Sequence, residues 1–206
     1  MTGQSRCLVI GGIMICRNLL ASFTASLALA LPLQAEPLSG DAARGLLFHA
    51  ERVEVARYTT EGLSAEEADL LTTVAQSQRY YAALAFAPDA GIMAEPTVFA
   101  ANYHDIANAR EAALRECNSR RQGGAACTIA LEVRPAGWQA RDLQLSADAT
   151  EAFNVDYQRI RGARALAISA RTGSWGIGQG DDPAAMAIAH CEESEGASDC
   201  AVVIAD

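Results

Sequence analysis

The pattern of apolar and polar positions is clearest in residues 163–206, where it predicts a strand, a hairpin turn, a second strand, a helix and a final strand. The first strand is the run of small and apolar residues at 165–169, and Gly173 supplies the turn. The helix ends at Cys191, and Cys200 opens the final apolar strand after a polar loop. We therefore expect a strand-strand-helix-strand unit in this segment.

Residues 80–135 show the same order of elements. The apolar run at 83–87 and the turn residue Gly91 precede the run at 165–169 and Gly173 by one constant offset in the sequence. Here too a helix ends at a cysteine, Cys117, and a second cysteine, Cys127, opens a strand. This self-similarity predicts an internal duplication.

The first copy is the longer of the two. Its offset from the second copy falls from 82 at the hairpin to 74 at the helix cysteines, so it holds eight extra residues. We expect its second strand at residues 92–94 and the extra residues in the connection 96–103. Because neither copy buries enough apolar surface alone, we predict an α+β fold in which two tandem strand-strand-helix-strand repeats pack as one pseudo-symmetric domain.

Two segments flank the repeats. Residues 36–79 predict an N-terminal helix-strand-helix segment, and residues 136–162 predict a helical connector. Each contains a Ser or Asp followed three residues later by Glu, which is typical of a capped helix start. These pairs are Ser64 with Glu67, and Asp148 with Glu151. In the second copy, Asp182 before Pro183 predicts a helix that begins at the proline.

Residues 1–35 have the features of a signal peptide. Arg17 precedes an apolar run at 19–33, and the small residue Ala35 stands before Glu36. The run is shorter than the roughly 20 apolar residues that span a bilayer, so we expect cleavage and a periplasmic or secreted bacterial protein. A second apolar patch ahead of Met14 raises the hypothesis that translation starts there rather than at Met1.

Four cysteines remain beyond the leader, and an even number in an exported chain favours disulfides over zinc or a free thiol. Four cysteines allow three pairings. A duplication favours one bridge per copy, Cys117 with Cys127 and Cys191 with Cys200. Their spacings of nine and eight intervening residues are longer than those typical of zinc sites.

Charge narrows the choice of partner. All 25 acidic residues but only 14 of the 16 arginines lie in residues 36–206, so this part carries a net charge of −11. Such a surface disfavours nucleic acid and anionic lipid, both of which need cationic protein groups. A basic envelope protein is an allowed partner, although the charge also serves solubility alone.

The chain contains no lysine. Pyridoxal-phosphate enzymes form a Schiff base with a lysine amine, and phosphate-binding loops of the Gly-Lys-Ser/Thr type need the same residue. The sequence therefore excludes both classes. It also lacks a Gly-x-Ser-x-Gly elbow, and no free cysteine is left beyond the leader if both bridges form.

The second copy resembles a family of small exported bacterial proteins that share a domain of unknown function, the DUF4189 type. The residues that carry the resemblance are Ala165-Leu166-Ala167-Ile168-Ser169, Gly173, Trp175-Gly176, the Ala-rich helix to Cys191, and Asp199-Cys200. The first copy is less similar, with Met93-Ala94 where Trp-Gly is expected. The family has no assigned catalytic residues. Similar chains are sometimes labelled 5-aminolevulinate synthase, a label that the absence of lysine contradicts.

Three groups of residues are candidates for chemistry. Gly176, Gly178 and Gly180 lead into a helix and are able to cradle a phosphate, but the acidic Asp181 and Asp182 follow them. Glycines at a spacing of two more simply mark a strand face that another backbone approaches closely. We therefore assign no nucleotide site and no other cofactor.

Histidines and tryptophans supply the other two groups. His104, Asp105 and His190 have the chemistry of an acid-base pair or of metal ligands, although nothing in the sequence brings them together. Trp138 and Trp175 are candidate anchors for a protein partner, because tryptophan is frequent at binding hot spots, and core positions are the alternative for both.

We therefore expect an exported protein that works by binding rather than catalysis. Its leading role is an interaction protein of the bacterial envelope, such as an inhibitor or immunity-type partner of a basic cell-wall enzyme or toxin. We assign no catalytic, cofactor-binding or metal residues for this role. The alternative is a small periplasmic hydrolase or metal-dependent enzyme that uses His104, Asp105 and His190. The oligomeric state does not follow from the sequence.

Overall fold

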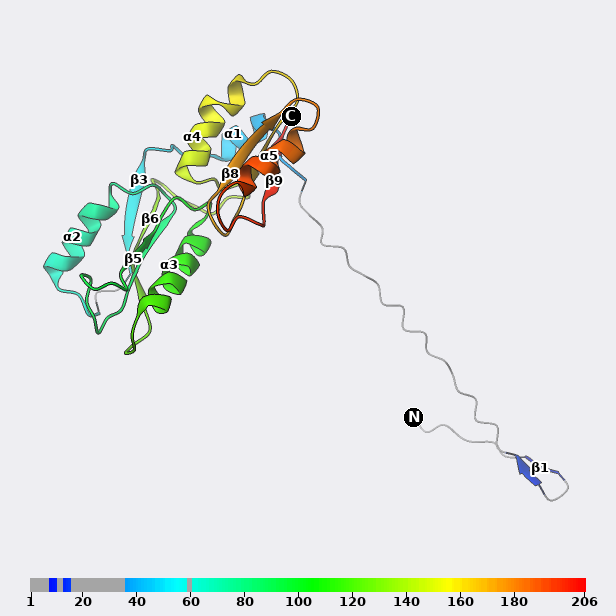
Figure 1. Ribbon diagram of the computed structural model, residues 1–206, viewed down its shortest axis with the longest axis horizontal. Helices are drawn as coiled ribbons and strands as arrows, with labels where there is room; N and C mark the ends of the chain where they lie inside the picture. The colour runs from blue at the N-terminus through cyan, green and yellow to red at the C-terminus, as the bar shows by residue number, and fades with distance from the viewer. Residues whose placement is uncertain (1–7, 11–12, 16–35, 59–60) are drawn as a thin grey trace. The chain divides into compact units, whose positions relative to one another are not determined.

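The computed structural model describes residues 8–10, 13–15, 36–58 and 61–206 (Figure 1). The chain divides into two units, residues 1–35 and residues 36–206. In the first unit, β1 (Leu8–Ile10) and β2 (Ile13–Ile15) pair as an antiparallel hairpin. The apolar run of the predicted signal peptide, residues 19–33, lies outside the described residues. Among the described residues, every helix is too short or too polar to cross a bilayer.

The first sheet of residues 36–206 has four antiparallel strands in the order β3-β6-β4-β5. The strands are β3 (Val53–Arg57), β4 (Ala82–Phe86), β5 (Val98–Ala100) and β6 (Thr128–Pro135). Helix α3 (Ile106–Arg120) packs on β4, β5 and β6, while α2 (Ala65–Ala75) contacts β3 and β6. Strand β4 lies between two neighbours and is buried along its whole length.

The second sheet has three antiparallel strands in the order β8-β7-β9, and a helix packs on one of its faces. The strands are β7 (Arg164–Ile168), β8 (Trp175–Gln179) and β9 (Ala201–Ala205), and the helix is α5 (Pro183–Glu192). Ala165 and Ala167 of β7 form a cluster of small side chains with Ala187 and Cys191 of α5. The small residues on this face let the helix lie close to the sheet.

The other face of the second sheet carries larger side chains. It packs against α1 (Gly40–Leu46), α4 (Ala147–Val155) and the 3-10 turn η1 (Tyr157–Arg159). Leu166 and Ile204 from the sheet are fully buried there. The connector predicted at residues 136–162 is therefore helical, and its helix helps to cover this core.

The segment 36–79 contributes to both sheets. Its strand β3 pairs with β6 along the first sheet, from Val53 opposite Pro135 to Arg57 opposite Leu131. Leu38 instead forms a parallel bridge with Ile204 of the second sheet. Residues 36–79 do contain the predicted helix, strand and helix, but these elements are shared between two cores.

The two sheets have the same connection order. In each, the first strand of the unit, β4 or β7, lies between the second strand and the last one. The pairing of that central strand with the last strand shifts register between Leu84 and Ala85 in the first sheet. In the second sheet the shift falls between Leu166 and Ala167, at the same offset along the chain that separates the two turn glycines.

The strand predicted at residues 92–94 is wrong. Those residues lie in successive turns, in which Gly91 N–H donates to Ala87 O and Thr97 N–H donates to Ala94 O, and the strand begins only at Val98. Val98 pairs with Ala85 as Gly176 pairs with Ala167 in the second sheet. Met93-Ala94 are thus not the structural counterparts of Trp175-Gly176, because local turn bonds take the place of ladder bonds there.

Two of the three predicted helix starts are confirmed. Ser64 and Glu67 form a reciprocal capping box at α2, and Asp182 caps α5 with Pro183 in its first turn. The cap predicted at Asp148 is wrong. Helix α4 begins earlier, where the Ser146 hydroxyl accepts from Ala149 N–H at 3.2 Å, and this leaves the Asp148 carboxylate free for other contacts.

Both disulfides have the predicted pairing. Cys117 at the end of α3 is bonded to Cys127 before β6, and Cys191 in α5 is bonded to Cys200 before β9. Each bridge ties a helix to the strand that follows it and closes a short loop. Loops of this size contribute about 2 to 3 kcal/mol each, chiefly by restricting the unfolded chain.

Candidate functional site

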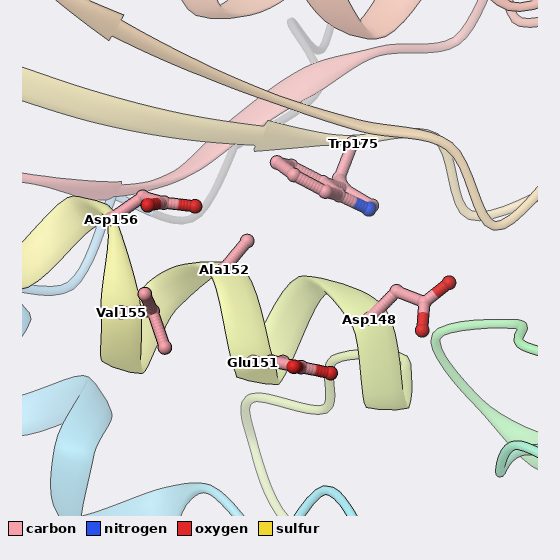
Figure 2. A pocket seen from close by; sticks show the side chains of 6 residues that line it. All are labelled: Asp148, Glu151, Ala152, Val155, Asp156 and Trp175. Atoms are coloured by element: carbon pink, nitrogen blue, oxygen red, sulfur yellow. The ribbon is translucent and has the colours of Figure 1, made fainter.

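A pocket of about 300 Å³ lies between helix α4 and the first residue of β8, and we call it the Trp175 pocket (Figure 2). It is lined by Asp148, Glu151, Ala152, Val155, Asp156 and Trp175. Figure 2 shows the indole facing the helix, with Ala152 pointing toward it and the carboxylates of Asp148 and Asp156 toward either end. The pocket thus combines an aromatic surface with three acidic side chains.

Helical spacing explains why these side chains meet. Positions 148 and 152 lie on α4 and position 156 is its C-cap; each is four residues from the next, so their side chains lie along one face. Trp175 reaches them from the sheet, where it is half-buried and packs against the second core. Val155 is 40 % exposed and extends the apolar surface beside the ring.

One arginine balances part of the pocket's negative charge. Arg79 Nε lies 3.1 Å from Asp148 Oδ1, and Arg79 Nη2 lies 3.1 Å from Glu151 Oε2. Asp156 is exposed, and its carboxylate makes no hydrogen bond or ion pair with the described residues. Three carboxylates against one guanidinium leave a surplus of two negative charges, which favours a cationic group over the indole.

Asn102 joins the pocket to the loop after β5 of the first sheet. Its Nδ2 donates to Asp148 Oδ2 at 2.8 Å, and its Oδ1 accepts from the Asp148 N–H at 3.2 Å. The residue has a positive φ of 64°, and its carbonyl oxygen would lie only 2.5 Å from a Cβ added to Gly173. The loop after β5 therefore holds the hairpin of the second sheet at close range, and this requires glycine at 173.

A second pocket of about 430 Å³ adjoins the first at Trp175. Its lining includes Asn102, Ser174, Trp175 and Ser194, so it lies on the side of the hairpin turn. The indole of Trp175 consequently borders a polar hollow and an acidic one.

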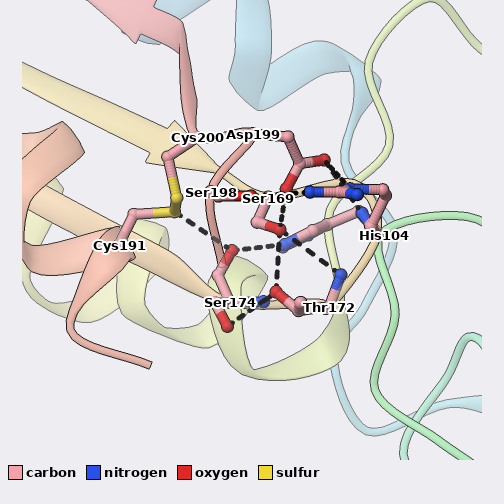
Figure 3. Close-up of a disulfide and its surroundings, with 9 residues drawn as sticks. His104, Ser169, Thr172, Ser174, Cys191, Ser198, Asp199 and Cys200 are labelled. Atoms are coloured by element: carbon pink, nitrogen blue, oxygen red, sulfur yellow. Dashed lines mark hydrogen bonds and ion pairs between the residues drawn. A yellow bond between two sulfur atoms is a disulfide. The ribbon is translucent and has the colours of Figure 1, made fainter. Parts of the chain in front are cut away.

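A polar network joins the turn between β7 and β8 to Asp199 (Figure 3). The Ser169 hydroxyl donates to Asp199 Oδ1 at 2.5 Å and accepts from Thr172 Oγ1 at 2.7 Å. Burial works to raise the pKa of Asp199, but the hydrogen bonds from Ser169 and from Arg171 N–H outweigh it and hold that pKa below its ordinary value. Ser169 is fully buried, so this network fixes the turn rather than offering a nucleophile.

His104 has a structural position. It is 2 % exposed, its Nδ1 accepts from Ser146 N–H at 3.0 Å, and its Nε2 lies 2.9 Å from Ser174 O. Since Nδ1 is the acceptor, Nε2 carries the hydrogen and donates to that carbonyl. Burial lowers the pKa of His104 and keeps the ring neutral. The ring links the start of α3, the start of α4 and the second hairpin.

The other two residues of the predicted acid-base group, Asp105 and His190, each form a hydrogen bond with a backbone group. Asp105 caps α3, where its carboxylate accepts from Asn108 N–H at 2.8 Å. His190 is exposed on α5, and its Nδ1 donates to Ile177 O at 2.8 Å. No hydrogen bond between described residues joins His104 to His190, and the described part of the chain has no group of three acidic, His or Cys side chains that is able to hold a metal.

Trp138, the second predicted anchor, has its ring already engaged. The Arg134 guanidinium lies 4.5 Å from the ring centroid, and the indole Nε1 donates to Gln144 Oε1 at 3.0 Å. Trp138 packs at the margin of the hydrophobic core of the first sheet. Of the two tryptophans, Trp175 is therefore the one whose ring is open to a ligand.

Arg134 also belongs to a cluster that the sequence did not predict. Glu132 lies in the middle of β6 and is fully buried although its side chain is charged. Its Oε2 accepts from Arg134 Nε at 2.8 Å and from the Tyr58 hydroxyl at 2.9 Å, and Arg110 Nε lies 3.2 Å from its Oε1. Two guanidiniums compensate the buried charge, so removing either one would leave Glu132 less compensated at a cost to the fold.

The glycines of β8 face a helix backbone. A Cβ added to Gly176 would lie 2.3 Å from Ala187 O, and one added to Gly178 would lie 2.0 Å from Pro183 O. The space that a phosphate would need is filled by α5. This agrees with the simpler interpretation of their spacing, close approach of a second backbone.

Comparison with known family models, with curated proteins and with solved structures finds no match to this chain.

The acidic pocket was missed by sequence reasoning, although a signal was present. Asp148 and Glu151 are three residues apart, which places them on neighbouring turns of one helix, and Asp156 follows as the residue that caps the end of that helix. The spacing of the first two was interpreted as a capping pair instead. That Trp175 would lie opposite them depends on contacts between distant segments, which periodicity does not reveal.

Proposed function

We propose that this chain is an exported, non-catalytic binding protein of the bacterial envelope whose partner is a basic protein, such as a cell-wall enzyme or a toxin that it inhibits. The observation that carries the proposal is the Trp175 pocket. An indole and three carboxylates, balanced by a single arginine, provide a surface that is complementary to a cationic side chain.

The charge of the whole chain supports the same partner. Residues 36–206 carry 25 acidic residues against 14 arginines. An excess of this size steers a basic protein toward the surface and speeds association at low ionic strength. The Trp175 pocket then provides the central contact of the complex, because a desolvated aromatic contact is the usual centre of a binding hot spot.

Two disulfides support an oxidising compartment outside the cytoplasm. With the leader-like pattern of residues 1–35, they favour the periplasm or secretion. We also propose that residues 80–135 and 163–206 arose by duplication, which the shared strand order and the register shifts at equivalent positions support. The similarity of the second copy to the DUF4189 type is part of this proposal.

The enzymatic alternative has no comparable support. An acid-base role for His104 requires an accessible nitrogen, but both ring nitrogens are engaged with backbone groups in a buried site. We therefore propose binding as the function.

Affinity capture tests this proposal. The protein with both disulfides formed is immobilised and exposed to an envelope extract of its own organism at about 50 mM and about 500 mM salt, because screening shortens the range of charge attraction as salt rises. We expect a basic protein to be retained in stoichiometric amount at low salt and released at high salt. Retention of no protein, or of an acidic one, would contradict the proposal.

A further inference from the structure

Strand β8 forms the outer edge of the second sheet, because the strand order places β7 on one side of it and no described strand on the other. The hydrogen bonds of the hairpin determine which backbone groups point outward. Ser169 N–H donates to Ser174 O, and Gly180 N–H donates to Ala163 O. Because an antiparallel ladder alternates, Gly176 and Gly178 also bond toward β7.

Trp175, Ile177 and Gln179 consequently direct their N–H and C=O groups away from the sheet. His190 occupies one of these six groups, since its Nδ1 donates to Ile177 O. The other five have no hydrogen bond with the described residues. An edge of this kind is a template for an added strand.

The edge and the pocket meet at Trp175. Leu166 and Ile177, which are paired across the sheet, both belong to the core on the α4 side, and Trp175 packs there too. Directly opposed residues of paired strands place their side chains on the same face, about 5 Å apart. A residue paired with Trp175 from outside would therefore point toward α4 and enter the Trp175 pocket.

We propose that β8 and the Trp175 pocket together form a docking site for an extended segment of the basic partner, which adds to the edge of β8 as a strand and places an arginine or lysine side chain in the pocket. The commitment to a basic residue follows from charge complementarity with Asp148, Glu151 and Asp156. This inference rests on the proposed function, which it deepens by naming the surface and the form of the ligand.

The backbone and the pocket have separate roles at this site. The outward N–H and C=O groups bind any extended segment regardless of sequence, and the pocket selects the residue opposite Trp175. Small residues at Gly176 and Gly178 keep α5 on the opposite face, so the helix does not enter the space on the pocket side.

A short peptide tests the site directly. The probe is acetyl-Thr-Val-Arg-Val-Thr-amide, titrated into the isotope-labelled protein with both disulfides formed, with amide and indole chemical shifts as the readout. We expect saturable shifts centred on the amides of Trp175, Ile177 and Gln179 and on the Trp175 indole. The same peptide with glutamate in place of arginine should bind at least about tenfold more weakly, which corresponds to about 1.4 kcal/mol.

Matched variants separate the two roles. Gln179→Pro removes an outward N–H at an exposed edge position where proline is tolerated, while Gln179→Thr retains it. We expect the proline variant to weaken the peptide about fivefold or more and the threonine variant to bind as the wild type does. Asp156→Asn should weaken the arginine peptide about threefold to tenfold and leave the glutamate peptide no weaker than before.

Shifts spread over the acidic surface, or equal binding by the proline and threonine variants, would overturn the strand-addition site. Capture of a basic envelope protein by wild type and Gln179→Pro alike would overturn this site but retain the proposed function. If no basic protein is captured at all, the proposed function fails, whatever the peptide does.

Discussion

The chain contains two strand-strand-helix-strand segments: the first unit, with β4, β5, α3 and β6, and the second unit, with β7, β8, α5 and β9. They share a strand order but differ in the residues on which their helices pack. In the second unit the residues that face the helix from β8 are Gly176 and Gly178, and the backbone of α5 fills the space where side chains would stand. Their counterparts by register in the first unit are Val98 and Ala100 of β5. The absence of side chains at these two positions of β8 is what lets α5 pack so closely on the second sheet.

The difference also extends to the opposite faces. With α5 close to β8, the other face of the second sheet is left to α1 and α4, and the Trp175 pocket forms between α4 and the start of the strand. The first unit instead has a long turn at residues 87–97 before β5. The same connection order therefore accompanies the Trp175 pocket, which we propose as a binding surface, in the second unit and a turn before β5 in the first.

The largest expected effect comes from filling the glycine face. Gly178→Ala would place a Cβ 2.0 Å from Pro183 O and 2.5 Å from Ala187 N, so α5 must shift away from the sheet. We expect a loss of about 3 kcal/mol or more in the free energy of unfolding, measured in urea. Gly45→Ala is the matched control, because no atom lies within 4 Å of its added Cβ and alanine favours a helix by about 0.5 to 1 kcal/mol. Equal stability of Gly178→Ala and the wild type would disprove the close packing of α5 on β8.

Removing one disulfide at a time compares the units directly. The bridges span 10 and 9 residues, so replacing both cysteines of either pair with alanine should cost a similar amount, about 2 to 3 kcal/mol. Urea unfolding of the two double variants without reductant measures this. A loss in the free energy of unfolding in only one of the two double variants would show that the two bridges do not stabilise the protein equally.

His104 links the units and should make their joint stability depend on pH. Burial lowers its folded-state pKa below the ordinary 6.5, so the unfolded chain binds more protons just below pH 6.5. Stability from this group is present above pH 6.5 and is lost as pH falls from there toward the folded-state pKa, by at most about 1.4 kcal/mol per pH unit.

The measurement is the free energy of unfolding between pH 5 and pH 7.5. His104→Gln should flatten the curve in this range, whereas His49→Gln, at an exposed position, should leave it unchanged. A wild-type slope that persists in His104→Gln would assign the pH dependence to another group.

The smallest effect on stability is expected at the pocket itself. Asp156 is exposed and without a described partner, so Asp156→Asn should change the free energy of unfolding by less than about 0.5 kcal/mol. Thermal or urea unfolding checks this. A large loss in the free energy of unfolding would mean that Asp156 serves the fold, which would contradict the proposed binding role of the pocket.

Local patterns predicted most of the second unit. The small-apolar run of β7, the turn at Gly173 and the Asp182-Pro183 helix start are short-range signals, and each led to the correct element. The bridge between Cys191 and Cys200 was instead predicted from the similarity of the two segments, which favoured one bridge in each. The first unit was harder to predict because β5 has only three residues and follows successive turns, so its alternation is too short to read.

The proposed binding surface was mostly beyond such patterns. Trp175 could be proposed from its residue type, but its neighbours come from α4, which lies before residues 163–206 in the chain. The burial of Glu132 and His104 likewise depends on partners from distant segments, Tyr58 and Arg110 in one case and Ser146 and Ser174 in the other. Tertiary contacts of this kind leave little trace in hydrophobic periodicity.

The most direct measurement is parallel capture from the organism's own envelope extract by the wild type and by the doubly neutralised variant Glu151→Gln/Asp156→Asn, each at low and at high salt. The account predicts that the wild type retains one basic protein at low salt, that high salt releases it, and that the variant retains much less although it is folded. Equal retention by both proteins, or retention that does not depend on salt, would contradict it.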